Sequence, residues 1–166
     1  SLTSDTAHNA PTTFVKAKGN ISIFANNGYV KLNNSTYSGK LILIPKDDDK
    51  FSILEEIGIE EFLPGVVEGE MPIMWNNDAL QAQVIAVRTY VLYKRKIKGN
   101  ALYHINKLDL AYKGSYMNQS KSKEIVDKTR GTVMVYDWNL FPGYFHSTCG
   151  GHTEDINLVF NLRSIP

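Results

Sequence analysis

The sequence contains one cysteine, Cys149, so no disulfide can form within the chain. A single thiol leaves the cellular compartment open, because many exported bacterial proteins also avoid disulfides. No run of about eighteen apolar residues is present, so no segment is expected to span a membrane. The formal net charge is +1, which gives no general electrostatic reason to expect nucleic acid or an acidic membrane surface as a partner. A neutral or mixed polar substrate fits this charge better.

The length of 166 residues and the hydrophobic fraction of 43% predict one domain with a substantial core. Residues 1–12 are rich in Ser, Thr, Asn and Pro and are expected to form a loose N-terminal arm, which leaves 13–166 as a single domain. The chain begins with Ser1 and ends abruptly at Pro166. We therefore expect a processed or trimmed protein that lacks an upstream signal or anchor and has an incomplete C-terminal end.

The hydrophobic pattern predicts an α+β fold. Short strands are expected at residues 14–15, 21–24, 30–32, 40–44 and 51–54, with a hairpin turn at 26–28. Helices are expected at 59–67, 78–98 and 119–130, followed by strands at 132–136 and 140–146 around a turn at 137–139. The helix at 78–98 can be capped by Asn77 and is apolar on much of its circumference. It is therefore expected to be central and largely buried.

Glu70 is the main candidate for a catalytic acid. It precedes the pair Met71 and Pro72, and proline forces the residue before it out of helical geometry, so Glu70 is expected beside a sharp bend. Val66, Val67, Met71 and Trp75 supply apolar neighbours. A carboxyl group that apolar neighbours shield from water can donate a proton near neutral pH. The alternative is a carboxylate that caps a helix N-terminus near residues 76–77, and nearby Glu68, expected to be a solvated acid, is the first rival for the catalytic role.

Three residues of the central region are candidates for substrate binding. Arg88 interrupts an apolar helix, so it either pairs with a nearby acid or donates hydrogen bonds to substrate oxygens. Tyr90 and Tyr112 are suited to stacking on sugar rings, and their alternative is packing in the core.

The segment from Tyr144 to Asp155 holds a second group of candidates. Gly150 and Gly151 allow a tight turn with exposed backbone amides. The polar residues around this turn, which we expect to form a groove wall facing Glu70, are His146, Ser147, Thr148 and Glu154. The alternative for this segment is a strand that ends in a glycine turn.

Zinc is a further alternative for the same segment. His146, Cys149 and His152 supply three side chains that can bind zinc, but their spacing matches no recognised zinc finger or helical pair of histidines. No metal or other cofactor is therefore assigned from the spacing.

Several motifs together resemble the SpoIID/LytB family, which includes stage II sporulation protein D and the amidase-enhancer proteins. They lie in the family's order at residues 59–67, 69–72, 75, 79–83, 86–90, 129–131 and 145–154. The resemblance implies a substrate groove and action on bacterial peptidoglycan outside the cytoplasm. Sporulation protein D is a lytic transglycosylase of glycan strands stripped of stem peptides, and the glutamate of its Glu-Met-Pro motif, here Glu70, is the catalytic acid.

The resemblance also carries an alternative and two departures. The amidase-enhancer branch implies a non-catalytic module that binds peptidoglycan and acts with other cell-wall hydrolases. Some clostridial members bind zinc after the central helix, where His104 stands in this chain, but the accompanying cysteines are replaced near Leu110 and Gly114. Leu110 also stands where many members have Gln in Gln-x-Tyr-x-Gly, so the family's substrate contact at this position is not carried over.

Overall fold

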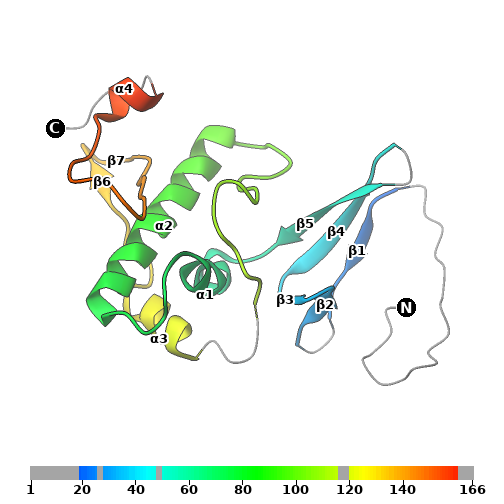
Figure 1. Cartoon of the computed structure of the whole chain (residues 1–166). Coiled ribbons are helices and arrows are strands. Elements are labelled where there is room, and N and C mark those ends of the chain that lie inside the picture. The colour runs from blue at the N-terminus through cyan, green and yellow to red at the C-terminus, as the bar shows by residue number, and fades with distance from the viewer. Residues whose placement is uncertain (1–18, 26–27, 48–49, 116–119, 161–166) are drawn as a thin grey trace.

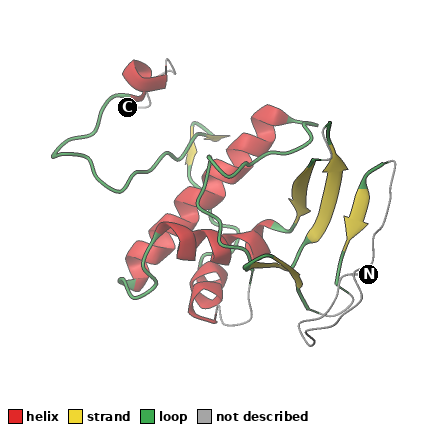
Figure 2. Cartoon of the chain, turned by 45° about the vertical axis from the view of Figure 1, so that its right-hand side comes forward, coloured by secondary structure: helices red, strands yellow, loops and turns green. Residues whose placement is uncertain are grey.

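The computed structural model describes residues 19–25, 28–47, 50–115 and 120–160. The predicted N-terminal arm at 1–12 and the predicted strand at 14–15 lie outside these residues. The described chain has both helices and strands, which confirms the predicted α+β fold. Its three-stranded sheet lies at one side of a helical cluster, and the last helix lies at the opposite side (Figure 1, Figure 2). None of the described helices is both long and apolar enough to cross a bilayer.

The sheet is antiparallel and contains β1 (Ile21–Ile23), β4 (Lys40–Pro45) and β5 (Phe51–Glu56) in the order β1-β4-β5. In its register, Leu43 of β4 lies opposite Ile21 of β1 and Ile53 of β5. Side chains alternate between the two faces of a strand, so these three residues share one face. The apolar pairs across the strands explain why this register forms.

The predicted hairpin between residues 21–24 and 30–32 is wrong. β1 pairs with β4, whereas β2 (Val30–Leu32) pairs with β3 (Ser35–Tyr37), a strand that the sequence pattern did not reveal. The turn of the actual hairpin includes Asn33, at a positive φ of 53°, a conformation that asparagine adopts more readily than most residues. A long apolar strand was available to β1 in β4, and pairing with it outweighed the local turn signal at 26–28.

Three helices form the core. They are α1 (Ile59–Glu70), α2 (Asn77–Lys98) and α3 (Ser120–Lys128), and each packs against the other two. The buried cluster includes Leu63, Val66 and Val67 from α1, Leu80, Val84, Val87 and Tyr90 from α2, Leu110 from the next loop, and Ile125 and Val126 from α3. The middle of α2 is enclosed on all sides, because residues 83–94 include no exposed residue, whereas Ala79 and Ala82 near its start are exposed. Its N-cap is Asn76, one residue before the predicted Asn77.

Two glycines of α1 allow the loop after α2 to pass close to this helix. A Cβ atom on Gly65 would overlap the Gly114 carbonyl oxygen, and one on Gly69 would overlap the Ala111 carbonyl oxygen. The Lys113 amide donates a hydrogen bond to the Gly65 carbonyl at 3.3 Å. The spacing of four residues places both glycines on one side of α1, and this side holds residues 111–114 against the helix.

The C-terminal region is less regular than the sequence predicts. Its strands are limited to β6 (Val135–Tyr136) and β7 (Asn139–Leu140), and residues 141–146 continue without strand pairing. Asp137 and Trp138 both have positive φ and form the tight turn between these strands. The short helix α4 (Ile156–Phe160) follows and has no buried residue.

Candidate active site

Glu70 is the last residue of α1, and its side chain is half-buried. Met71 has φ −135° and ψ 144°, so the chain leaves the helix at the bend that Pro72 predicts. The Ala111 amide donates a hydrogen bond to Glu70 Oε1 at 2.7 Å. Glu70 therefore does not cap a helix N-terminus. Asn76 has that role, since its Oδ1 accepts a hydrogen bond from the Asp78 amide at 2.7 Å.

Glu70 lies at a pocket of about 360 Å³ that α1, α2 and two loops form together. The other lining residues are Tyr90, Lys107, Leu108, Asp109, Leu110, Ala111, Tyr144 and Phe145. The apolar surroundings of the carboxyl group thus come largely from segments distant in sequence. The expected neighbours Val66 and Val67 instead lie fully buried in the core, and Trp75 is 54% exposed.

Asp109 is a second carboxylate in this pocket, and its oxygens are already engaged. Oδ1 lies 2.8 Å from Lys94 Nζ and accepts the Tyr90 hydroxyl at 3.0 Å, while Oδ2 accepts the Asn106 amide at 2.9 Å. Burial disfavours the charged form, but the hydrogen bonds from Lys94, Asn106 and Tyr90 outweigh it and lower the pKa of Asp109. The same contact with Asp109 raises the pKa of Lys94. This part of the pocket is therefore a charged, hydrogen-bonded cluster.

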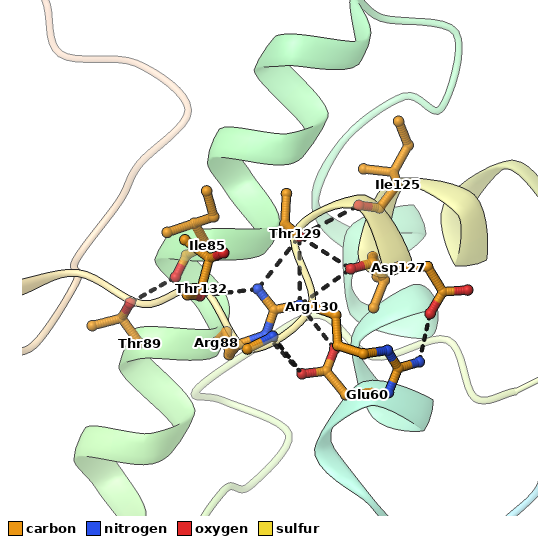
Figure 3. Close-up of polar contacts among 11 residues, drawn as sticks. Glu60, Ile85, Arg88, Thr89, Ile125, Asp127, Thr129, Arg130 and Thr132 are labelled. Atoms are coloured by element: carbon orange, nitrogen blue, oxygen red, sulfur yellow. Dashed lines mark hydrogen bonds and ion pairs between the residues drawn. The ribbon is translucent and has the colours of Figure 1, made fainter.

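Arg88 lies in the ion pair that the sequence left open as an alternative. Its side chain is 1% exposed, and Nε and Nη2 donate to the two Glu60 oxygens at 3.0 and 2.8 Å (Figure 3). Nη1 donates to the Thr132 carbonyl at 3.1 Å, and the guanidinium also contacts Thr129 and the Val126 carbonyl at 3.4 Å. Arg88 joins α1, α2 and the end of α3 away from the pocket of Glu70, a geometry that suits a stabilising role.

The two candidate tyrosines have different positions. Tyr90 lines the pocket of Glu70, is 8% exposed and packs against Tyr144 with ring centroids 5.9 Å apart. Tyr112 packs between α1 and the β2–β3 hairpin, with its ring 4.7 Å from that of Phe62 and its hydroxyl 3.2 Å from Ser115 Oγ. Burial raises the pKa of Tyr112 well above its ordinary value. Tyr90 belongs to the buried core and also lines the pocket, whereas Tyr112 packs against α1 and the β2–β3 hairpin.

The polar candidates of the C-terminal segment are exposed. His146, Ser147, Thr148 and Glu154 lie beyond the two residues of this segment that line the pocket, Tyr144 and Phe145. Gly150 and Gly151 have φ of 65° and 114°, in agreement with the predicted turn. His152 Nε2 lies 3.6 Å from Glu154 Oε1. The structure brings the start of this segment to Glu70, while its polar residues extend away from the pocket lining.

The zinc alternative has no preformed site in the described part of the chain, where no group of three or more His, Cys, Asp and Glu side chains gathers for a metal ion. Cys149 is exposed, and His104 Nε2 lies 3.0 Å from the Gly99 carbonyl oxygen. The rival acid Glu68 is also not a solvated surface group, because it is half-buried and accepts a hydrogen bond from Ser122 Oγ at 2.6 Å.

Sequence reasoning did not find Asp109 or Ala111, and it included Tyr144 only as the first residue of the expected groove wall. Asp109 and Ala111 lie in a loop with weak periodicity, and Ala111 acts through its backbone amide, which no side-chain pattern reports. The one signal for this contact was the spacing of Gly65 and Gly69, which permits another segment of backbone to approach α1 closely.

Comparisons with known proteins identify the family of this chain. The family model described as "SpoIID: Stage II sporulation protein" matches residues 47–136. An uncharacterized protein of Brachyspira hyodysenteriae is 33% identical over 140 residues, covering 79% of this chain and 36% of that protein. The amidase enhancer of Bacillus subtilis is 34% identical over 104 residues, covering 63% of this chain and 14% of that protein.

Stage II sporulation protein D of Bacillus subtilis is 28% identical over 120 residues, covering 61% of this chain and 35% of that protein. Because the family model matches more than half of the sequence, the chain belongs to the SpoIID family. It is similar to proteins named amidase enhancer and stage II sporulation protein D. The chain spans about a third or less of the length of these curated relatives.

Proposed function

We propose that this chain is a lytic transglycosylase of bacterial peptidoglycan, with Glu70 as its single acid and base. The observation that supports this proposal most directly is the position of Glu70, half-buried at an open pocket and fixed through Oε1 by the Ala111 amide. The resemblance to stage II sporulation protein D implies this role for the glutamate of the Glu-Met-Pro motif, which is Glu70 in this chain. The substrate lies in the cell wall, so the protein acts outside the cytoplasm.

The reaction needs one proton-transfer group. Glu70 donates its proton to the oxygen that bridges MurNAc and GlcNAc, and the bond between that oxygen and the MurNAc anomeric carbon breaks. The 6-hydroxyl oxygen of the same MurNAc bonds to the anomeric carbon, and its proton passes to Glu70. The product is a 1,6-anhydro-MurNAc end, and no water is consumed. Because the nucleophile belongs to the substrate, holding the sugar in position replaces a second catalytic carboxylate.

The state of Asp109 is consistent with this chemistry. Ordinary glycoside hydrolysis uses two carboxyl groups that flank the scissile bond. Asp109 is in the pocket, but both of its oxygens already accept hydrogen bonds, from Lys94, Tyr90 and the Asn106 amide. An oxygen so engaged is poorly placed to attack a sugar or to activate water. This favours the mechanism with one free carboxyl group.

The proposed sugar contacts follow the walls of the pocket. The ring of Tyr144 is 44% exposed and stacks on Phe160 with centroids 4.5 Å apart, so it offers a rigid aromatic surface near Glu70. A saccharide that enters the pocket would meet this ring and the edge of Tyr90. We place His146, Ser147, Thr148 and Glu154 farther along the path of the glycan, where they would contact sugars next to the cleaved pair.

Product analysis tests this function. Purified protein is incubated with glycan strands stripped of stem peptides, and the products are analysed by mass spectrometry. We expect 1,6-anhydro-MurNAc ends, their loss in Glu70→Gln, and full activity in Glu124→Gln, which removes an exposed carboxylate on α3 that pairs with Lys128. Products that have gained water would identify a hydrolase. No product from the wild type, or equal activity in Glu70→Gln, would exclude the catalytic role.

A non-catalytic module that binds peptidoglycan and enhances an amidase is the second candidate. The similarity to a protein named amidase enhancer favours it. Leu110 also favours it, because this residue is 4% exposed and belongs to the core at the position where many members have Gln. Binding to purified sacculi without bond cleavage, equal in the wild type and Glu70→Gln, would support this candidate over the first.

A further inference from the structure

We propose that Asp109 is a positioning residue for Glu70, and that it acts by fastening the loop 106–111 to α2. This inference rests on the proposed function for its effect on rate, but its structural part can be tested without any activity. Asp109 touches neither reacting atom in the proposed mechanism. Its effect is transmitted through the backbone to Ala111, two residues later, whose amide holds the Glu70 carboxylate at 2.7 Å.

The first step is the contact with α2. Tyr90 and Lys94 are four residues apart and therefore lie on one side of that helix. The Tyr90 hydroxyl donates a hydrogen bond to Asp109 Oδ1 at 3.0 Å, and Lys94 Nζ lies 2.8 Å from the same oxygen. The Lys94 ammonium also lies 5.6 Å from the centre of the Tyr90 ring. The Asp109 side chain is 11% exposed, and a charge-assisted hydrogen bond in such a site is stronger than an exposed one.

The second step is the shape of the loop. Asp109 Oδ2 accepts the Asn106 amide at 2.9 Å, and the Asp109 amide donates to the Asn106 carbonyl at 3.0 Å. Asn106 Oδ1 in turn accepts the Leu108 amide at 2.7 Å. These bonds close the loop into a turn whose two oxygen-bearing side chains satisfy its own backbone. Asp109 thus sets the turn and also joins it to α2.

The third step is the delivery of Ala111 to α1. After the turn, Leu110 inserts into the core, and the absence of a side chain at Gly69 lets the Ala111 backbone lie against α1. The loop is therefore held by α2 on one side and α1 on the other, and the Ala111 amide reaches Glu70 Oε1 between them. Among the described residues, no hydrogen bond to Glu70 Oε2 is found. One oxygen of the acid is fixed and the other is available to a substrate.

The position of Glu70 on its helix explains why a fixed donor is needed. The C-terminal end of a helix carries partial negative charge, which repels a carboxylate in the last turn. Glu70 is the last residue of α1, and this helix has no basic residue in its last turn. Without the Ala111 amide, the carboxylate would turn away from the helix end toward water. A displaced loop would therefore misorient the acid, and it would also shift the wall of the pocket that residues 107–111 form.

Kinetics of Asp109→Asn test the effect on rate. The variant keeps the size of the side chain but removes the charge that pairs with Lys94. We expect kcat to fall roughly tenfold to a hundredfold, as for a misplaced catalytic group, while KM changes by a smaller factor. Lys94→Met should lower kcat as well, whereas Lys94→Arg, which keeps the positive charge, should retain most of the wild-type kcat. Asp127→Asn, which breaks the exposed pair between this α3 residue and Arg130, is the matched control and should keep the wild-type rate.

An NMR measurement of the Ala111 amide tests the positioning directly. In the wild type, the Ala111 amide proton is hydrogen-bonded to a carboxylate, so we expect its chemical shift to lie downfield. In Glu70→Gln the shift should move upfield. Asp109→Asn should move the same amide upfield while Glu70 is intact, and Asp127→Asn should not. An unmoved Ala111 amide in Asp109→Asn, or a raised KM at unchanged kcat, would overturn the proposal. If the wild type cleaves no glycan, the proposed function fails, and the amide shift still decides whether Asp109 positions Glu70.

Discussion

Arg88 and Glu60 form a two-point contact between α2 and α1, with Nε 3.0 Å from Oε1 and Nη2 2.8 Å from Oε2. Paired, parallel hydrogen bonds of this kind are the strongest geometry available to an arginine and a carboxylate. The arginine is 1% exposed and the glutamate 18%. The contact therefore fixes the two helices that carry Glu70 and Tyr90.

The first prediction concerns this pair. Arg88→Ala should lower the free energy of unfolding by about 3–5 kcal/mol, because it leaves the Glu60 charge partly buried without its partner. Arg130→Ala, which removes an exposed partner of Asp127, should change it far less, because water screens this pair. Urea denaturation of both variants measures the difference. A fully stable Arg88→Ala with a raised KM for glycan would instead return Arg88 to the role of substrate ligand.

The second prediction concerns Glu55 in β5. Burial raises its pKa, against the lowering effect of the nearby Tyr112 hydroxyl and of the Gly39 amide, which donates to Oε1 at 3.0 Å. Its Oε2 is buried and has no hydrogen-bond partner among the described residues. A raised pKa in the folded state means that the protonated form favours folding. The stabilisation by this proton is complete below the ordinary value of 4.5 and is lost as the pH rises through the folded pKa.

Glu55→Gln should therefore raise the Tm at pH 7, where the wild-type carboxylate is charged at a cost. Its advantage should shrink as the pH is lowered toward 4.5, because wild-type Glu55 then takes up a proton. Thermal melts across this range, with Glu56→Gln as the exposed control on the neighbouring residue, measure the trend. A Tm advantage that does not depend on pH would contradict the assignment.

The third prediction concerns the close contact of α1 with the loop that holds Ala111. Gly69→Ala gains helix propensity of up to about 1 kcal/mol, but its Cβ would overlap the Ala111 carbonyl. Backbone has little freedom to yield, so we expect net destabilisation by about 1–3 kcal/mol and a loss of glycan cleavage that exceeds the loss of folded protein. Gly19→Ala, with open space around it, is the control. An unchanged rate in Gly69→Ala would show that the loop can shift without cost.

The fourth prediction concerns the acid limb of stability. The lowered pKa of Asp109 means that its stabilising contribution is complete above the ordinary value of 3.8 and is lost as the pH falls through the folded pKa. The wild type should therefore be more stable than Asp109→Asn at pH 6, and the two should converge in strong acid. Urea denaturation at pH 6 and at successive values below 4 measures this convergence. A difference in the free energy of unfolding that stays constant with pH would show that the charge of Asp109 does not contribute to it.

The three core helices and most strands could be predicted because their signals are local, whereas the short helix α4 was not predicted. The bend after Glu70 follows from Pro72, and the helix at Asn77–Lys98 differs from its predicted start by one residue. The position of Glu70 on a bend was also a local signal. The SpoIID motifs that surround it then gave this single residue a role, which remains a proposal until its products are analysed.

The surroundings of Glu70 could not be predicted, because they depend on contacts across long stretches of sequence. Asp109 and Ala111 lie about forty residues away from Glu70, and Tyr144 lies farther still. The predicted strand pairing was wrong for the same reason, since β1 pairs with the distant β4 rather than with the adjacent β2. Arg88 could not be assigned either, because the choice between an ion pair and a substrate contact depends on whether an acid lies nearby. That acid, Glu60, is twenty-eight residues earlier in the sequence.

One helix carries both a structural and a chemical carboxylate. Glu60 lies in the first turn of α1 and Glu70 at its end, which separates them by about 15 Å at the usual helical rise. Substitutions this far apart, without shared partners, contribute independently to folding. A substitution at Glu70 should therefore leave the anchoring of α1 through Glu60 in place, so that this end of the helix can change its chemistry while the other end preserves the fold.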